Sequence, residues 1–260
     1  MNDHNFFYAI ESGNIKAIKK YITINEVNIN SQYNRDKDSA LTLALKKSNN
    51  ILALYFINKG INIHLCNDRG DNALILASTP LNYNIIDILI QRGIDIDFQN
   101  IYGDTAFIMA CHQGILSIVE NLYNACSNIN IRNKYRQSGL LYAVSMKKID
   151  VVKFLVNNGV KIDYRNMWSE TVFTISSRNN DKEMLKYLTY AYTKQCFLGN
   201  GVISNPEEAR FKSFRLEEDF YINEIISNVK MFITIYCITH IDIYQEIDIY
   251  SIINSSFRYI

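Results

Sequence analysis

Residues 100–110 have the sequence NIYGDTAFIMA, and related segments recur along the 260-residue chain at one fixed spacing. Asparagines stand 33 residues apart at five positions, and a column of small residues keeps the same step. The two columns are Asn34, Asn67, Asn100, Asn133 and Asn166, and Ala44, Ala77, Ala110, Ala143 and Ser176. Self-similarity at a period of about 20 to 50 residues is the signature of a stacked-repeat architecture. Such arrays usually work by presenting an extended surface to another macromolecule.

Each period contains the signals of two helices. A small polar residue stands five positions before the small column and can accept a hydrogen bond from the free amides of a helix start. These residues are Ser39, Asn72, Thr105, Ser138 and Thr171. A second helix is predicted by apolar pairs four residues apart, such as Ile118-Val119 with Leu122-Tyr123. Three second helices are then predicted to end at a glycine in the left-handed C-cap position: Gly60, Gly93 and Gly159. A short β-like run follows each of these glycines.

Helix, turn, helix, glycine stop and extended finger within 33 residues resemble the ankyrin repeat. The family pattern of a glycine turn before Thr-Pro-Leu-His-x-Ala is matched best by residues 100–110 and next best by residues 67–77, and the resemblance covers roughly residues 5–192. It implies an all-α fold, an α-solenoid of about six repeats with short β-hairpin fingers. The expected repeats are approximately 1–32, 33–66, 67–99, 100–132, 133–165 and 166–192.

The repeats depart from the family pattern in three columns, which indicates a divergent array. The proline of each first helix is replaced by Ala40, Ala73, Ala106, Gly139 and Val172, and the histidine by Thr42, Ile75, Ile108, Leu141 and Thr174. The finger glycine remains only as Gly70 and Gly103, with Lys37, Arg136 and Ser169 in the other repeats.

The period ends near Thr193, and residues 193–260 form a separate C-terminal region. Residues 205–208, with the sequence NPEE, predict a helix start, and residues 216–236 predict a helix. We therefore expect a mostly helical cap on the last repeat, because a repeat array needs its ends covered. The alternative is a two-part adaptor whose C-terminal region recruits a second protein such as ubiquitin-ligase machinery.

Charge and composition narrow the classes of partner and location. The net charge is +1, from 27 basic and 26 acidic residues, which gives no electrostatic reason to expect nucleic-acid or membrane binding. The N-terminus has no secretory signal pattern, and the five cysteines show no paired spacing. We expect a monomer in the cytoplasm, or in the nucleus by diffusion, and not a secreted protein. Abundant Ile, Asn, Lys and Tyr are typical of an AT-rich genome, such as that of a virus or host-associated organism.

One column singles out candidate binding residues at the finger tips: Asp36, Arg69, Tyr102, Tyr135 and Trp168. In stacks of this family the tips project from one edge, and aromatic and Arg side chains dominate the binding energy of protein interfaces. The resemblance thus implies a non-enzymatic module that binds a cellular or host protein through the tips and the concave helix surface. The alternative interpretation is that the aromatics stack on one another and stiffen the fingers. The other finger charges are interpreted as a solvated rim: Asp68, Asp71, Asp104, Lys134, Arg136 and Glu170.

No catalytic, cofactor or metal site is expected. Cys111-His112 has the look of a nucleophile beside a base, but Cys111 shares its column with Ile10, Leu45 and Val144 inside the first helices. It is therefore predicted to be a buried packing residue. His64 and Cys66 stand two apart without the second ligand pair that a zinc site needs.

Overall fold

The computed structural model describes residues 2–24, 27–79, 82–126 and 128–198. Within these ranges the chain forms twelve helices in six consecutive pairs. The pairs are α1 (Asn2–Glu11) with α2 (Ile15–Thr23), α3 (Ala40–Lys46) with α4 (Asn50–Asn58), α5 (Ala73–Ala77) with α6 (Tyr83–Gln91), α7 (Ala106–Gln113) with α8 (Leu116–Ala125), α9 (Gly139–Ser145) with α10 (Ile149–Asn157), and α11 (Val172–Arg178) with α12 (Lys182–Leu198).

The first helix of each pair after α2 begins at its predicted cap. The side-chain oxygen of each cap residue accepts a hydrogen bond from the backbone N–H three residues further on, as Thr105 does from Ile108 at 3.2 Å. The same bond forms at Ser39, Asn72, Ser138 and Thr171. Ser39 and Thr42 also bond reciprocally, which makes a capping box. All five predicted caps are confirmed.

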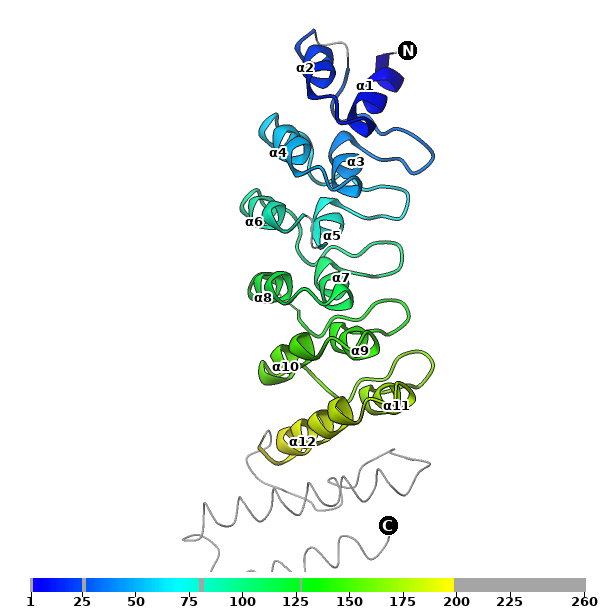
Figure 1. Cartoon of the computed structure of the whole chain (residues 1–260), viewed down its shortest axis with the longest axis vertical. Coiled ribbons are helices and arrows are strands. Elements are labelled where there is room, and N and C mark those ends of the chain that lie inside the picture. The colour runs from blue at the N-terminus through cyan, green and yellow to red at the C-terminus, as the bar shows by residue number, and fades with distance from the viewer. Residues whose placement is uncertain (1, 25–26, 80–81, 127, 199–260) are drawn as a thin grey trace, which may run out of the picture. The chain divides into compact units, whose positions relative to one another are not determined.

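The chain divides into two compact units, residues 1–175 and 176–260. In the first unit the odd-numbered helices form one layer and the even-numbered helices a second (Figure 1). Each central first helix packs against its neighbours in the stack: α7 contacts α5, α8 and α9. The small column is fully buried in this unit, at Ala44, Ala77, Ala110 and Ala143. Small residues at these positions let consecutive helices approach closely.

Five loops connect the pairs in the first unit and project beside the odd-numbered helices, on the side away from the even-numbered ones (Figure 1). We call the loop ends fingers 1 to 5: residues 33–38, 66–71, 99–104, 132–137 and 165–170. The expected β-hairpins are reduced in the described residues to two isolated antiparallel bridges, Tyr33 with Asp38 and Arg132 with Ser138. The β-like runs after Gly60, Gly93 and Gly159 contain turns or bends and no strand.

The second unit is described only through residue 198, where it comprises the end of α11 and α12. Asp181 accepts a hydrogen bond from the N–H of Met184 at 3.0 Å and caps the start of α12. This helix continues across residues 192 and 193, where the array was expected to end. The predicted helix start at 205–208, the helix at 216–236 and the cap or adaptor role all lie outside the described residues. No helix in the described part of the chain has the length and apolar character needed to cross a membrane.

Candidate functional site

The asparagine column forms the base of the fingers. The Oδ1 atom of Asn133 accepts hydrogen bonds from the backbone N–H groups of Tyr135 and Gln137, both at 2.9 Å. Asn67, Asn100 and Asn166 bind the residues two and four positions further on in the same way, at 2.9 to 3.0 Å. Asparagine makes such bonds readily because its short amide reaches the backbone two residues on. Each of these four asparagines therefore fixes the backbone of the tip residue of its finger.

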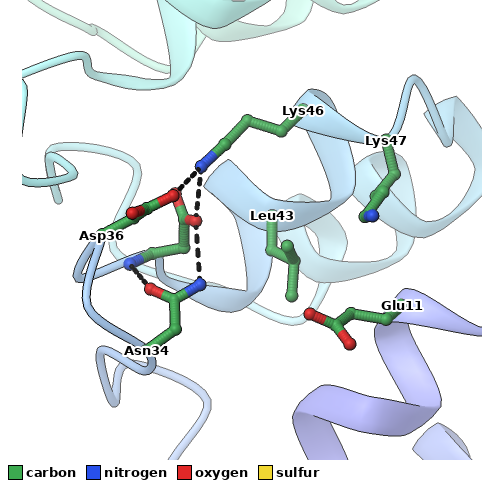
Figure 2. Close-up of a pocket in the computed structure, with 7 residues that line it drawn as sticks. Glu11, Asn34, Asp36, Leu43, Lys46 and Lys47 are labelled. Carbon is green, nitrogen blue, oxygen red and sulfur yellow. Dashed lines mark hydrogen bonds and ion pairs between the residues drawn. The ribbon is translucent and has the colours of Figure 1, made fainter.

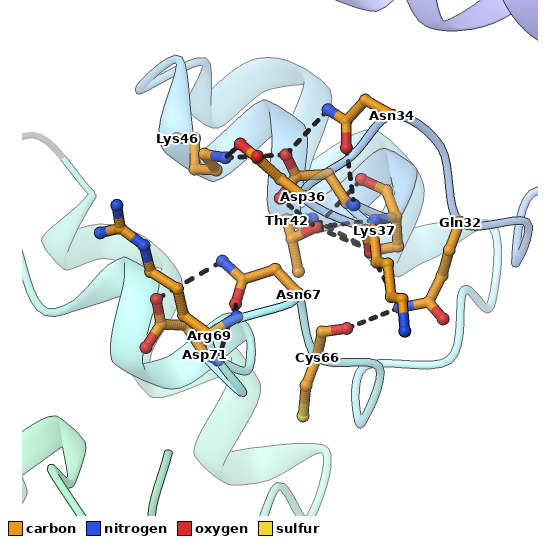
Figure 3. Close-up of polar contacts among 12 residues, drawn as sticks. Gln32, Asn34, Asp36, Lys37, Thr42, Lys46, Cys66, Asn67, Arg69 and Asp71 are labelled. Atoms are coloured by element: carbon orange, nitrogen blue, oxygen red, sulfur yellow. Dashed lines mark hydrogen bonds and ion pairs between the residues drawn. The ribbon is translucent and has the colours of Figure 1, made fainter. Parts of the chain in front are cut away.

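Finger 1 is held less firmly than the others. Asn34 is exposed, and its Oδ1 accepts one bond, from the N–H of Asp38 at 3.3 Å. Gln32 also binds this finger, since its Nε2 donates to the carbonyl of Lys37 at 2.8 Å (Figure 3), as Nε2 of Gln99 does to the carbonyl of Gly103 in finger 3 at 2.7 Å. The start of the array thus differs from its centre.

Carboxylates four positions after the asparagines accept hydrogen bonds from asparagine side chains, and two of these bonds link neighbouring fingers. The Nδ2 atom of Asn100 donates to Asp71 of the preceding finger at 2.8 Å, and that of Asn133 donates to Asp104 at 2.7 Å. In finger 5 the amide of Asn166 donates to Glu170 of its own finger at 2.8 Å. The interpretation of Asp71, Asp104 and Glu170 as part of a solvated rim was therefore wrong. Asp104 is buried, and its burial, helped by the nearby Asp71 carboxylate, raises its pKa.

Backbone hydrogen bonds also join each finger to the next. In every junction the residue after the asparagine donates its N–H to the carbonyl of the preceding tip residue. The four bonds are Asp68 to Asp36 at 2.7 Å, Ile101 to Arg69 at 3.0 Å, Lys134 to Tyr102 at 2.9 Å and Met167 to Tyr135 at 2.9 Å. We call this series the tip ladder. It brings adjacent tips to about the separation of neighbouring β-strands, ~5 Å.

Two of the three aromatic tip side chains lie against each other. The rings of Tyr135 and Trp168 are stacked, with centroids 6.1 Å apart and planes within 9° of each other. The exposed fractions are 39% for Tyr102, 39% for Tyr135 and 60% for Trp168. No other ring of the described residues lies against Tyr102. Stacking, the alternative interpretation from the sequence, therefore holds for one pair, and that pair remains open to solvent.

The other end of the tip column is polar. Asp36 and the buried Asp38 both contact Nζ of Lys46, each at 2.8 Å (Figure 2). The hydrogen bond and charge of Lys46 lower the pKa of Asp36. These groups border a hollow of about 230 Å³ that Glu11 of α1 also lines. Arg69 follows as the tip of finger 2 and is exposed (Figure 3). The five predicted tip residues thus change from charged to aromatic along the ladder.

The Cys111-His112 pair is a packing feature. Cys111 is fully buried, and a Cβ added at Gly139 of α9 would lie 2.8 Å from its sulfur, so the thiol fills space between two first helices. Burial raises the pKa of Cys111 far above its usual range, which suppresses the reactive thiolate. The ring of His112 meets that of Tyr142 edge-on at 5.1 Å, and its buried Nδ1 has no hydrogen-bond partner among the described residues. The prediction of a buried thiol is confirmed.

Reasoning from the sequence missed the role of the asparagine column and of the carboxylates four residues after it. Four of the five fingers carry Asp or Glu at that position, and finger 4 carries Gln137. This repeated pairing of an amide with an acid was the available signal. The amide and the acid that bond across repeats, such as Asn133 and Asp104, are 29 residues apart in the sequence.

A model of one protein family, described as ankyrin repeats (3 copies), matches three overlapping segments of the chain. The matched residues are 6–100, 82–166 and 107–198. No curated protein gave a match to the sequence.

Proposed function

The chain belongs to the ankyrin-repeat family, whose repeats are in general protein–protein interaction modules, and on that basis we propose that its fingers bind a cellular protein. Tyr102, Tyr135 and Trp168 form the centre of the binding surface, with Arg69 and Asp36 at its polar end. The concave face of the first helices continues it. One observation carries the proposal: three large aromatic side chains project from consecutive fingers and stay exposed.

The asparagine bonds and the tip ladder support a binding role through preorganisation. The backbone N–H of each aromatic tip residue donates to an asparagine of its own finger. The carbonyls of Tyr102 and Tyr135 also accept a hydrogen bond from the next finger, whereas Trp168 lies in the last finger. A surface whose backbone is already ordered loses less conformational entropy on binding. Aromatic side chains add large contact areas with few rotatable bonds. The surface therefore suits a partner whose contacting side chains match the fixed spacing between finger tips.

The experiment starts from affinity capture with the full chain, followed by mass spectrometry of the bound proteins. Binding of the captured partner is then measured for the triple variant Tyr102→Ala, Tyr135→Ala and Trp168→Ala. Truncation of a side chain at the centre of an interface often costs about 2 kcal/mol or more of binding free energy, so we expect at least a ~30-fold loss of affinity.

The matched control removes three exposed apolar side chains on or at the end of second helices, away from the fingers and the first helices: Ile24, Ile51 and Tyr83. We expect this variant to bind the partner as the unaltered chain does, with circular dichroism verifying that both variants fold. If the finger variant bound the partner with unchanged affinity, the proposal would be wrong.

A further inference from the structure

The finger tips divide into two halves of different chemistry. Each tip presents the three residues that follow its asparagine. Fingers 1 and 2 carry two carboxylates there, Asp36 and Asp68, among three cations. Fingers 3, 4 and 5 carry no carboxylate and present Ile101, Tyr102 and Gly103, then Lys134, Tyr135 and Arg136, then Met167, Trp168 and Ser169.

Finger 4 concentrates positive charge around the aromatic stack. Lys134 and Arg136 flank Tyr135, are exposed, and make no ion pair within the described part of the chain. The acid found at the base of the other four fingers is replaced here by Gln137. Its Oε1 atom is buried without a hydrogen-bond partner among the described residues. This finger therefore lacks the carboxylate that would offset its two cations.

The neighbouring carboxylates are already engaged. Asp104 is buried and bonded to Asn133, and Glu170 is half-buried and bonded to Asn166. Around the two cations lie exposed apolar side chains, with Ile101 exposed by 49% and Met167 by 53% in addition to the three aromatics. Aromatic residues, Met and Arg are the types enriched where proteins bind one another.

We infer that fingers 3 to 5 bind a protein segment in which carboxylate side chains alternate with aliphatic or aromatic ones. The carboxylates pair with Lys134 and Arg136, whose planar guanidinium suits bidentate bonding to a carboxylate. The apolar side chains cover Tyr102 and the Tyr135–Trp168 stack. This inference rests on the proposed function, because it assigns the chemistry of the partner to the same finger surface.

Cations beside aromatic rings also suit single-stranded nucleic acid, which combines phosphates with stacking bases. The charges of the remaining fingers favour protein. A nucleic-acid backbone running along the tip ladder would meet the carboxylates of Asp36 and Asp68 among the cations of fingers 1 and 2, and the net charge of +1 provides no general attraction to phosphate. An acidic protein segment can instead end at finger 3, since its charge is confined to a few side chains.

The test uses the folded full chain and three phage-displayed peptide libraries. All three randomise the same aliphatic and aromatic positions and differ in the alternating residues, which are Asp and Glu, Asn and Gln, or Lys and Arg. We expect at least about tenfold greater recovery from the acidic library than from the amide library, and least from the basic one. Equal recovery from the acidic and amide libraries, or no recovery from any, overturns the inference.

Charge-reversal variants locate the site with a control in the same register. Lys134→Glu with Arg136→Glu is compared with Arg35→Glu and Lys37→Glu, which occupy the same two columns in finger 1. Lys37 and Arg136 also share a left-handed backbone, with φ of 53° and 57°. We expect the finger 4 pair to weaken binding of the selected acidic peptides about tenfold or more, and the finger 1 pair to change it less than about twofold.

Two further outcomes separate the inference from the proposed function. If Tyr135→Ala with Trp168→Ala abolishes peptide binding while charge reversal in finger 4 does not, the proposed function stands and the acidic chemistry is wrong. If the aromatic variant binds the peptides normally, the proposed function fails. Tighter binding of a poly(U) oligonucleotide than of the selected peptides overturns the inference in favour of nucleic acid. Thermal unfolding by circular dichroism verifies the fold of every variant.

Discussion

The side chain of Asn133 holds two fingers at once: its Nδ2 donates to the carboxylate of Asp104 at 2.7 Å, while its Oδ1 accepts from the N–H of Tyr135 at 2.9 Å. The residue that keeps the 33-residue period is thus also the residue that positions an aromatic tip. Stability and the proposed binding surface share the same hydrogen bonds, so variants of this column report on both.

The first prediction concerns this asparagine column. Asn133 is buried, and Asn133→Ala removes four side-chain hydrogen bonds and leaves the backbone N–H groups of Tyr135 and Gln137 without their acceptor. We expect the free energy of unfolding to fall by about 2 to 4 kcal/mol in urea titrations. Asn34→Gly is the control, because glycine tolerates the left-handed φ of 65° at this position, and it should cost less than about 1 kcal/mol, since Asn34 is exposed and its side chain bonds only to Asp38. Equal losses from the two variants would contradict this account of the column.

The second prediction concerns the left-handed residue at the end of each tip. Gly103 has a φ of 80°, and an added Cβ would lie 2.8 Å from the N of Lys134, which belongs to the tip ladder. Gly103→Ala should therefore destabilise the chain by about 1 to 3 kcal/mol, from backbone strain and from loss of the ladder bond.

Ser169 occupies the same column with a φ of 60° and no glycine to relieve it. Ser169→Gly should raise the free energy of unfolding by about 0.5 to 1 kcal/mol, because glycine adopts this conformation without steric cost. Both changes are measured by urea unfolding. A destabilised Ser169→Gly would show that the serine side chain outweighs the strain.

Features within one repeat were predictable from the sequence, and features between repeats were not. Thr105 caps the helix that begins at the next residue by accepting from the N–H of Ile108, so residue type and spacing were enough to predict it. The bond from Asn133 to Asp104 depends on how two repeats stack, and no local rule distinguishes that acid from a solvated one. β-Hairpins were expected after Gly60 and Gly93, yet each tip joins the next by one backbone hydrogen bond. Strands need a longer run of such bonds.

The third prediction concerns pH. Burial, aided by Asp71, raises the pKa of Asp104 above its ordinary value. Between the ordinary and the raised value the folded chain holds more protons than the unfolded chain, so stability falls as pH rises through that window. Asp104→Asn keeps an acceptor for Asn133 and removes this loss. The stability of Asp104→Asn relative to the unaltered chain should therefore increase from about pH 4 to about pH 7.

Asp36→Asn provides a control with the opposite sign. Lys46 lowers the pKa of Asp36, so its contribution is present above the ordinary pKa and is lost as pH falls. The stability of Asp36→Asn relative to the unaltered chain should therefore decrease as pH rises toward the ordinary pKa of Asp, and should change little from about pH 4 to about pH 7. Thermal unfolding of the three chains, extended below about pH 4, measures both trends, and a rise of Asp36→Asn parallel to that of Asp104→Asn would refute the assignment.

The last prediction concerns the stack of Tyr135 and Trp168. Offset stacked rings contribute about 0.5 to 1.5 kcal/mol beyond the area they bury, and exposure of this pair places it near the lower limit. A double-mutant cycle of Tyr135→Ala and Trp168→Ala, followed by urea unfolding, should give a coupling of about 0.5 kcal/mol. The cycle of Tyr102→Ala and Trp168→Ala should give none, because their fingers are not adjacent. The same two cycles on partner binding then separate the two interpretations of the aromatics. Coupling in stability with no loss of binding means that the rings only stiffen the fingers, whereas loss of binding in each single variant means that the stack is itself the contact surface.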